Sequence, residues 1–207
     1  MLFTKVFHQD QERVNERLEL SDKGSLYFLG PRLTLRDCSL LLKVPARNLL
    51  LQDARFIGCT FEVKQELSNH QQWLFASLRG CRIKGRLSGC DFGRWPGFSS
   101  GWEYGLLEDC DFSEARLDAC RFHGCAPESL RLPRWPCFTV LDPVGRGDEL
   151  ARGPWPTRFG RAVIEDLARY PPSTTAVTFF APAAAKRFET TEEELRAVVE
   201  KFDCIVY

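Results

Sequence analysis

Apolar residues recur along this chain with a period of five, most regularly over residues 107–125. A large apolar side chain falls at every fifth position there, and a small one stands two places before it, as in Cys110-Asp-Phe112 and Ala115-Arg-Leu117. Neither an α-helix, with about 3.6 residues per turn, nor a simple alternating strand repeats every five residues. The period is typical of short, equal strands stacked in coils, each sending one small and one large side chain inward.

The same period continues upstream in a less regular form, with a unit that reads Leu, two residues, a small residue, one residue and an apolar residue. This unit occurs at 35–40, 51–56, 78–83 and 87–92. Cys38, Cys59 and Cys81 recur after about twenty residues, which four five-residue sides would supply, so we expect them to stack coil on coil. The pattern predicts a mainly β fold, an irregular β-helix over 1–125 with its repeats clearest at 35–61, 76–92 and 107–125.

The flanking segments lack this period. Residues 9–19 are polar, which predicts a short helix or a capping hairpin before a first strand at 25–30. After the repeats, six prolines over 126–157 predict a long irregular crossing rather than regular structure. We expect a small α/β cap over 158–207.

Inside that cap, residues 158–170 predict a helix and 174–180 a strand. Thr191 and Glu194 form a capping box that opens a second helix, and 203–207 predict a final short strand. Strand, helix and strand together suggest a right-handed crossover unit. Its expected place is against the end or flank of the coil, covering a sheet edge that would otherwise be exposed.

Two insertions break the repeats, at 63–75 and 93–105, and insertions in a solenoid commonly emerge as loops that carry the binding face. The second is rich in aromatic residues and glycines, and tryptophan, tyrosine and arginine dominate binding hot spots. The predicted partner-binding residues are Arg94, Trp95, Phe98, Trp102, Glu103 and Tyr104 of the second insertion, with His70 and Trp73 of the first. An alternative stays open, in which the second loop folds back and covers an open face with its aromatic rings.

The nine cysteines do not favour a metal site, because the chain has no Cys-x-x-Cys pair. Alanine takes the same position as cysteine in other repeats, at Ala54 and Ala115, so the cysteines are interpreted as small buried fillers. No phosphate-binding loop or other cofactor motif is present in the sequence, and no cofactor is predicted. His123 follows Phe122 at an outward position, which predicts a solvated surface histidine.

Charge is balanced, with 28 basic and 28 acidic side chains, which argues against binding to nucleic acid and against imitation of it. No apolar run is long enough to cross a bilayer, and the first residues lack the apolar stretch of a signal peptide. We therefore expect a cytoplasmic protein with no membrane partner, in which the thiols stay reduced.

The stretch 35–125 resembles the pentapeptide-repeat family, whose unit is a small residue, a polar residue, Leu or Phe, and two polar or small residues. Ala115-Arg-Leu117-Asp-Ala and Cys120-Arg-Phe122-His-Gly match this unit well, whereas 62–77 and 93–106 depart from it. The resemblance implies a right-handed quadrilateral β-helix. Members of this family are mostly binding scaffolds rather than enzymes, and those that imitate DNA display an acidic face, which the charge balance here does not provide.

A coil with an α/β appendage and no catalytic motif also resembles immunity proteins of interbacterial toxin systems. That resemblance implies a monomer that binds a secreted bacterial toxin domain in a 1:1 complex and blocks its active site sterically. Nuclease toxins usually require an acidic inhibitor, so an NAD-consuming toxin such as an ADP-ribosyltransferase is favoured. Two alternatives stay open: a structural or scaffold protein, and an enzyme that uses the thiol of Cys125 with His123.

Overall fold

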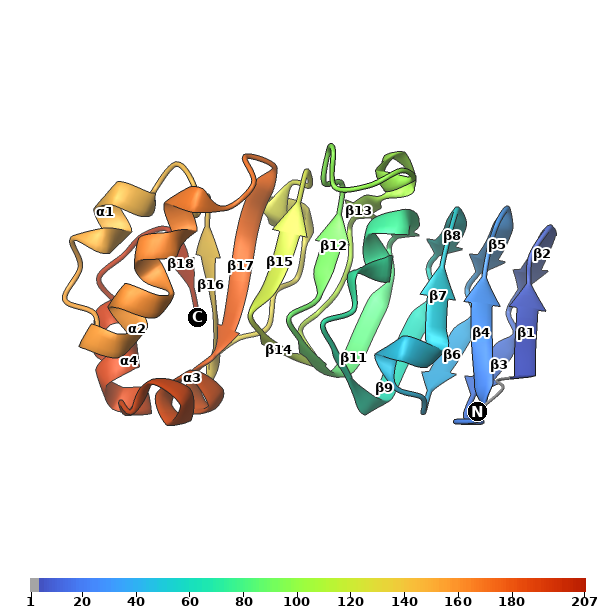
Figure 1. Ribbon diagram of the computed structural model, residues 1–207, viewed down its shortest axis with the longest axis horizontal. Helices are drawn as coiled ribbons and strands as arrows, with labels where there is room; N and C mark the ends of the chain where they lie inside the picture. The colour runs from blue at the N-terminus through green and yellow to red at the C-terminus, as the bar shows by residue number, and fades with distance from the viewer. Residues whose placement is uncertain (1–3) are drawn as a thin grey trace.

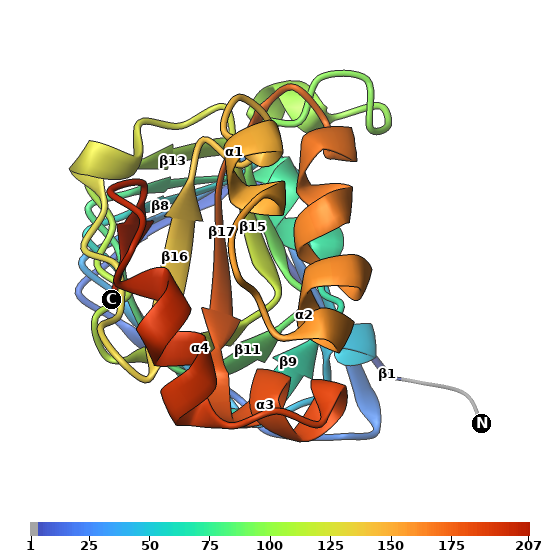
Figure 2. The ribbon, with the colours of Figure 1, turned by 90° about the vertical axis from the view of Figure 1, so that its left-hand side faces the viewer.

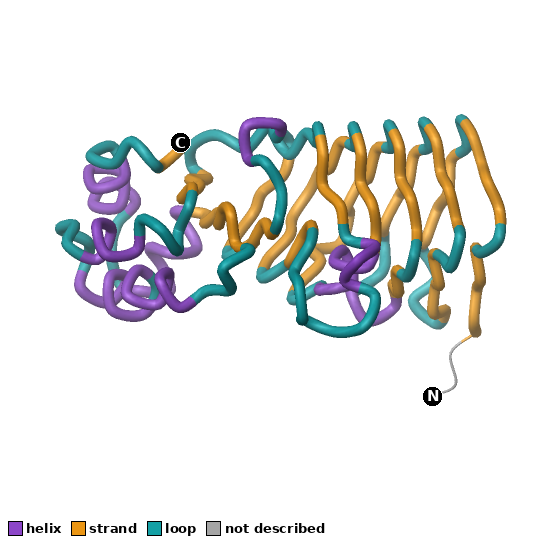
Figure 3. Tube along the Cα trace, turned by 90° about the horizontal axis from the view of Figure 1, so that it is seen from above, coloured by secondary structure: helices purple, strands orange, loops and turns teal. Residues whose placement is uncertain are grey.

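The computed structural model describes residues 4–207 and shows an elongated parallel β-solenoid with a small α/β unit at its C-terminal end (Figure 1). Viewed from above, the strands follow one another along the long axis and most of the helices gather at one end (Figure 3). The mainly β fold and the stacked coils that the five-residue period predicts are confirmed.

Three sheets of parallel strands, named A, B and C, form the walls of the solenoid in the described part of the chain. Sheet A contains β1 (Thr4–His8), β4 (Ser25–Leu29) and β7 (Leu49–Leu51). Sheet B contains β2 (Gln11–Val14), β5 (Leu33–Arg36), β8 (Ala54–Ile57), β10 (Ala76–Arg79) and β13 (Leu106–Glu108). Sheet C contains β3 (Arg17–Leu20), β6 (Ser39–Leu42), β9 (Thr60–Ser68), β11 (Arg82–Ser88) and β14 (Ala115–Asp118). Seen end-on, sheets B and C lie on opposite sides of the coil (Figure 2).

Inward side chains stack from coil to coil because neighbouring strands pair in register. In sheet B, Leu35 pairs with Phe56, Phe56 with Leu78, and Leu78 with Leu107. All four side chains are buried. Each coil thus covers the apolar face of the coil below it, which a single coil could not bury alone.

The corners between strands explain the five-residue period. A residue with left-handed backbone precedes the small residue at most corners, as Asp37 (φ 53°) precedes Cys38 and Gly58 (φ 64°) precedes Cys59. Left-handed backbone is costly for most residues but accessible to glycine, asparagine and aspartate. The chain turns there and begins the next strand, so the small inward residue comes at a fixed place after each turn.

Eight of the nine cysteines are buried, and six of these, all in the solenoid, bond through their thiols to the neighbouring coil. Cys59 Sγ donates to the carbonyl oxygen of Leu35 at 3.3 Å, and Cys81 Sγ donates to that of Phe56 at 3.3 Å. Burial raises the pKa of the Cys120 thiol well above its usual value, so this group stays protonated and unreactive. The cysteines are packing residues, as their exchange with alanine predicts.

The first coil begins earlier than the sequence predicts. Residues 9–19 contribute to β2 and β3 rather than to a helix or hairpin, and β1 precedes the expected first strand. The prediction was wrong because the inward positions of β2 hold polar residues, Gln11 and Arg13, which pair with Leu33 and Leu35. Arg13 Nε donates to Gln11 Oε1 at 2.9 Å, and both residues are half-buried. Polar side chains therefore cover this part of the terminal coil.

Sheet A is interrupted on the C-terminal side of β7. The short helix η2 (Gln71–Phe75) packs against β7 on one side and against β12 (Asp91–Gly93) on the other. From β12 the strand order continues through β15 (Cys120–His123), β17 (Thr174–Phe180) and β16 (Cys137–Leu141) to β18 (Ile205–Val206). The last sheet of the solenoid is therefore also the sheet of the α/β unit.

The α/β unit covers the edge of β15, because β17 pairs with that strand antiparallel. Its helices are α1 (Gly147–Ala151), α2 (Thr157–Ala162), η5 (Ile164–Arg169), α3 (Ala181–Phe188) and α4 (Glu192–Val199). The strand at 174–180 and the capping box of Thr191 and Glu194 are confirmed. The helix α3 was not predicted from the sequence. Nor were β16 and α1, which are regular elements in the segment predicted as an irregular crossing.

The close approach of neighbouring coils can be tested by a substitution at Gly85. Its φ is +109°, and a Cβ there would lie 2.2 Å from the carbonyl oxygen of Val63. We expect Gly85→Ala to lower the free energy of unfolding by roughly 2–5 kcal/mol, from backbone strain plus the clash. Gly97→Ala is the matched control, because Gly97 also has positive φ (+79°) but nothing within 4 Å, and should cost only about 1 kcal/mol. Equal losses of unfolding free energy for the two variants in urea titrations would contradict a tight contact between the coils at Gly85.

Candidate protein-interaction surface

The outward positions of sheets B and C carry charged side chains that pair across the coils. Exposed ion pairs join neighbouring coils, for example Arg36 with Glu12 at 2.5 Å, Lys43 with Glu19 at 2.8 Å, and Arg79 with Glu108 at 2.8 Å. Exposed pairs of this kind contribute about 0–1 kcal/mol each, so they add little stability. Their main effect is to keep these two faces well hydrated.

Sheet A differs, because apolar residues form a ladder on its outward face. Phe7 of β1 pairs in register with Phe28 of β4, and Phe28 pairs with Leu50 of β7. The Phe7 and Phe28 rings are stacked with centroids 4.7 Å apart, and Phe7 is 53% exposed. Together these residues form a contiguous exposed apolar patch, a feature that is common at interaction sites.

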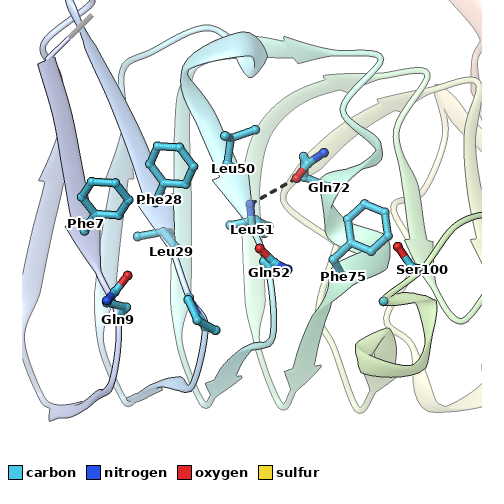
Figure 4. Close-up of a pocket in the computed structure, with 13 residues that line it drawn as sticks. Phe7, Gln9, Phe28, Leu29, Leu50, Leu51, Gln52, Gln72, Phe75 and Ser100 are labelled. Atoms are coloured by element: carbon cyan, nitrogen blue, oxygen red, sulfur yellow. Dashed lines mark hydrogen bonds between the residues drawn. The ribbon is translucent and has the colours of Figure 1, made fainter.

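The ladder leads to the 93–105 insertion through Phe75 of η2. The Phe75 and Phe98 ring centroids are 6.3 Å apart, and Gly101 lies against Phe75. A concave pocket of about 390 Å³ runs from Phe7 to Gly101 over this ladder (Figure 4). None of its thirteen lining residues is charged, and its polar side chains are Gln9, Gln52, Gln72 and Ser100. We call the ladder Phe7, Phe28, Leu50 and Phe75, together with the 93–105 loop, the sheet A surface.

The predicted binding residues of the second insertion divide into two groups. Trp95 is half-buried, stacks on the ring of His123 at 4.7 Å and lies 4.6 Å from the Phe98 ring. Phe98 and Trp102 are also half-buried. Trp95 therefore folds back onto the coil, while Phe98 lies next to Phe75 at the end of the pocket.

The remaining predicted residues of this loop are exposed. Tyr104 is 45% exposed, and Arg94 and Glu103 also face solvent. Glu103 Oε2 accepts a hydrogen bond from the Gly101 backbone N–H at 3.0 Å, and Arg94 Nε donates to the Gly105 carbonyl oxygen at 3.3 Å. These bonds within the loop hold its exposed part in one arrangement.

His70 and Trp73 are buried, so they do not lie on the surface where the sequence places them. His70 is 3% exposed and Trp73 fully buried, and their rings pack edge to face at 5.6 Å. The 63–75 insertion does not emerge as a loop, because it lengthens β9 and then forms η2 inside the gap in sheet A. Burial lowers the pKa of His70 to about 4. The sheet A surface therefore does not include these two side chains.

His123 is also buried rather than solvated, and it belongs to a polar cluster that was not predicted from the sequence. Arg121 binds both carboxylate oxygens of Asp91, at 2.6 and 2.8 Å, and His123 Nε2 lies 3.0 Å from Asp91 Oδ1. His123 Nδ1 lies 3.2 Å from Thr174 Oγ1. Burial alone would raise the pKa of Asp91, but the hydrogen bonds from His123 and Arg121 and the charge of Arg121 together lower it. The cluster joins β12, β15 and β17.

The repeat pattern did contain a signal for this cluster. Asp91 stands between Cys90 and Phe92 as Arg121 stands between Cys120 and Phe122. The two residues therefore occupy the same place in the repeat, and they pair in register. Opposite charges at equivalent repeat positions indicate an ion pair across coils.

The structure does not bring Cys125 and His123 together as a catalytic pair. Cys125 Sγ lies 3.4 Å from Thr175 Oγ1, whereas His123 bonds to Asp91 and Thr174. Burial raises the pKa of the Cys125 thiol, which disfavours the thiolate that a nucleophile needs. Among the described residues, no group of three or more Cys, His, Asp or Glu side chains could hold a metal ion.

The buried His70 predicts a dependence of stability on pH. In the unfolded chain His70 gains a proton near its ordinary pKa of 6.5, but in the folded protein only near about 4. Its contribution is therefore complete above pH 6.5 and is lost as the pH falls towards 4. Between pH 7 and pH 4.5 it should account for roughly 2–3 kcal/mol of lost unfolding free energy. In urea titrations at the two pH values, His70→Gln should reduce this loss of unfolding free energy by the same roughly 2–3 kcal/mol. A loss as large as that of the wild type would show that His70 is hydrated.

The Asp91 cluster predicts a large loss of stability on truncation. Asp91→Ala removes the partner of a half-buried guanidinium and of a buried imidazole, so we expect the free energy of unfolding to fall by about 3–5 kcal/mol. Glu12→Ala is the control, because it removes an exposed carboxylate that also bonds an arginine, and should cost about 1 kcal/mol or less. Similar losses for the two variants in chemical denaturation would show that the Asp91 cluster contributes no more than a surface pair.

Comparison with known proteins does not assign a function to these residues. No family model matches the chain, and no curated protein sequence matches it. Across residues 4–207, no helix has both the length and the apolar character needed to cross a membrane. The likeness to pentapeptide-repeat proteins therefore rests on the coil architecture and on the repeat pattern that produces it.

Proposed function

We propose that this protein is a binding scaffold whose sheet A surface holds another protein. The observation that carries the proposal is the contrast between faces: outward positions of sheets B and C bear paired charges, whereas Phe7, Phe28 and Leu50 form an apolar ladder. The ladder ends at a loop whose exposed part holds Arg94, Glu103 and Tyr104. Apolar area surrounded by polar residues is typical of protein interfaces.

The mechanism is steric occlusion by a rigid surface. The ladder lies on strands that are already paired within sheet A, so little backbone conformational entropy is lost when a partner binds. Phe75 lines one end of the pocket with Phe98 beside it, and Trp102 and Tyr104 of the same loop extend the surface beyond it. Aromatic side chains at such positions bury large area at low entropic cost.

The finer proposal is an immunity-type role, in which the partner is a secreted bacterial toxin domain and binding covers its active site. Its support is the resemblance in organisation, a coil with an α/β appendage, together with the overall charge balance, since nuclease toxins usually require an acidic inhibitor. The balanced charge favours an NAD-consuming toxin such as an ADP-ribosyltransferase. The direct experiment is to co-express the protein with the product of each adjacent reading frame and to assay 1:1 inhibition. Complete lack of protection and of complex formation would contradict this role.

The loop makes a specific prediction about affinity. Trp102→Ala should weaken binding to the partner by more than ~2 kcal/mol, because it removes an aromatic anchor from the surface. The melting temperature should stay nearly unchanged, since Trp102 is only half-buried. Arg55→Ala on sheet B is the control and should leave affinity unaltered. Both variants are measured by calorimetric titration and thermal melting. A large loss of thermal stability in Trp102→Ala with intact binding would assign the loop to the core.

A further inference from the structure

The pocket on sheet A restricts the chemistry of whatever occupies it. Its volume is about 390 Å³, and its thirteen lining residues include no charged side chain, although charged residues make up 27% of the chain. A charged group placed there would lose hydration with no counter-ion to replace it. The occupant's contact face is therefore apolar and uncharged, with polar groups only where they meet the amides of Gln9, Gln52 and Gln72.

The arrangement of the ladder restricts the shape of the occupant. Each of the three strands contributes one rung, Phe7, Phe28 and Leu50, and Phe75 of η2 follows them (Figure 4). Paired strands lie about 4.8 Å apart, so the rungs follow one another along the solenoid axis at roughly that spacing. Successive turns of an α-helix bring side chains to the same face about every 5.4 Å. Alternate residues of an extended strand come about every 6.7 Å, so a helix matches the rungs and a strand does not.

A second copy of this chain is a poor occupant. Three strands of three to five residues give the flat part of sheet A an area of roughly 200 Å² at the usual strand spacing and rise. A stable interface needs about 800 Å² on each partner. Two such faces packed together would therefore fall well short, whereas a helix can occupy the pocket as one element of a larger interface that includes the loop.

We propose that the sheet A pocket receives an amphipathic α-helix of the partner, lying along the solenoid axis across the strands. Uncharged apolar residues at positions i, i+3 or i+4, and i+7 of that helix rest on successive rungs of the ladder. Its N- or C-terminal turn meets Phe75 and Gly101 at the closed end of the pocket. This inference deepens the proposed function and rests on it, because it names the element by which the partner is held.

The test is a selection from a displayed library of random 16-residue peptides on the full-length protein. Peptides that bind the wild type are counter-selected against Phe28→Lys, and Leu50→Glu serves as an independent second variant. Thr34→Lys, which places the same charge on the outward face of sheet B, is the control. Circular dichroism and thermal melting of each variant confirm that it is folded before use.

The proposal expects enriched peptides with apolar residues at a period of 3.5 and no charge on that stripe. They should become helical on binding, and lose at least tenfold in affinity for Phe28→Lys and Leu50→Glu but not for Thr34→Lys. An apolar period of two in the enriched peptides would show that the occupant is a strand and not a helix. Wild-type dimers that Phe28→Lys abolishes would show that the occupant is a second copy of this chain. Failure to enrich any Phe28-dependent peptide would also overturn the proposal. The proposed function is judged separately, by whether the Trp102→Ala variant loses the native partner.

Discussion

In-register stacking of parallel coils is the constraint on which the rest of this structure depends. Because Leu35, Phe56, Leu78 and Leu107 lie one above another, each inward position must suit the residue one coil away as well as its own strand. The buried thiols of the solenoid follow the same rule, since each of them reaches a carbonyl oxygen of the coil before it. Outward positions share this register but do not pack into the core. Residues of one type at equivalent outward positions therefore line up across the coils as a ladder.

Much of the fold could be predicted from the sequence because this constraint leaves a regular trace. The small and large inward residues, the strand at 174–180 and the capping box at Thr191 all follow from local patterns. The first coil could not be recognised, because a terminal coil has no neighbour on one side and places Gln11 and Arg13 at inward positions. The helix α3 was missed because Ala-Pro-Ala-Ala-Ala carries no apolar stripe of large residues.

The candidate site was predicted less completely, for a different physical reason. An insertion can emerge from a solenoid or fill a gap in it, and local composition does not separate the two outcomes. The 93–105 loop emerges, whereas the polar 63–75 insertion buries Trp73 beside Phe92, with ring centroids 5.6 Å apart. His123 appeared to be outward because its neighbour Phe122 points in, but the Trp95 ring stacks on it and Asp91 and Thr174 bond to it, so it is buried. The apolar ladder on sheet A was invisible as a surface until three strands distant in sequence were placed side by side.

The two ends of the solenoid determine how the molecule behaves at high concentration. An uncapped stack of parallel coils is a template on which further copies can add end to end, which gives fibres rather than closed assemblies. Here the half-buried Arg13 lies over the leucines of the next coil at one end, and antiparallel β17 closes β15 at the other. No further parallel strand can pair with that edge of β15, so the stack does not continue past the α/β unit. The apolar face of sheet A can therefore remain exposed without open-ended growth at this end.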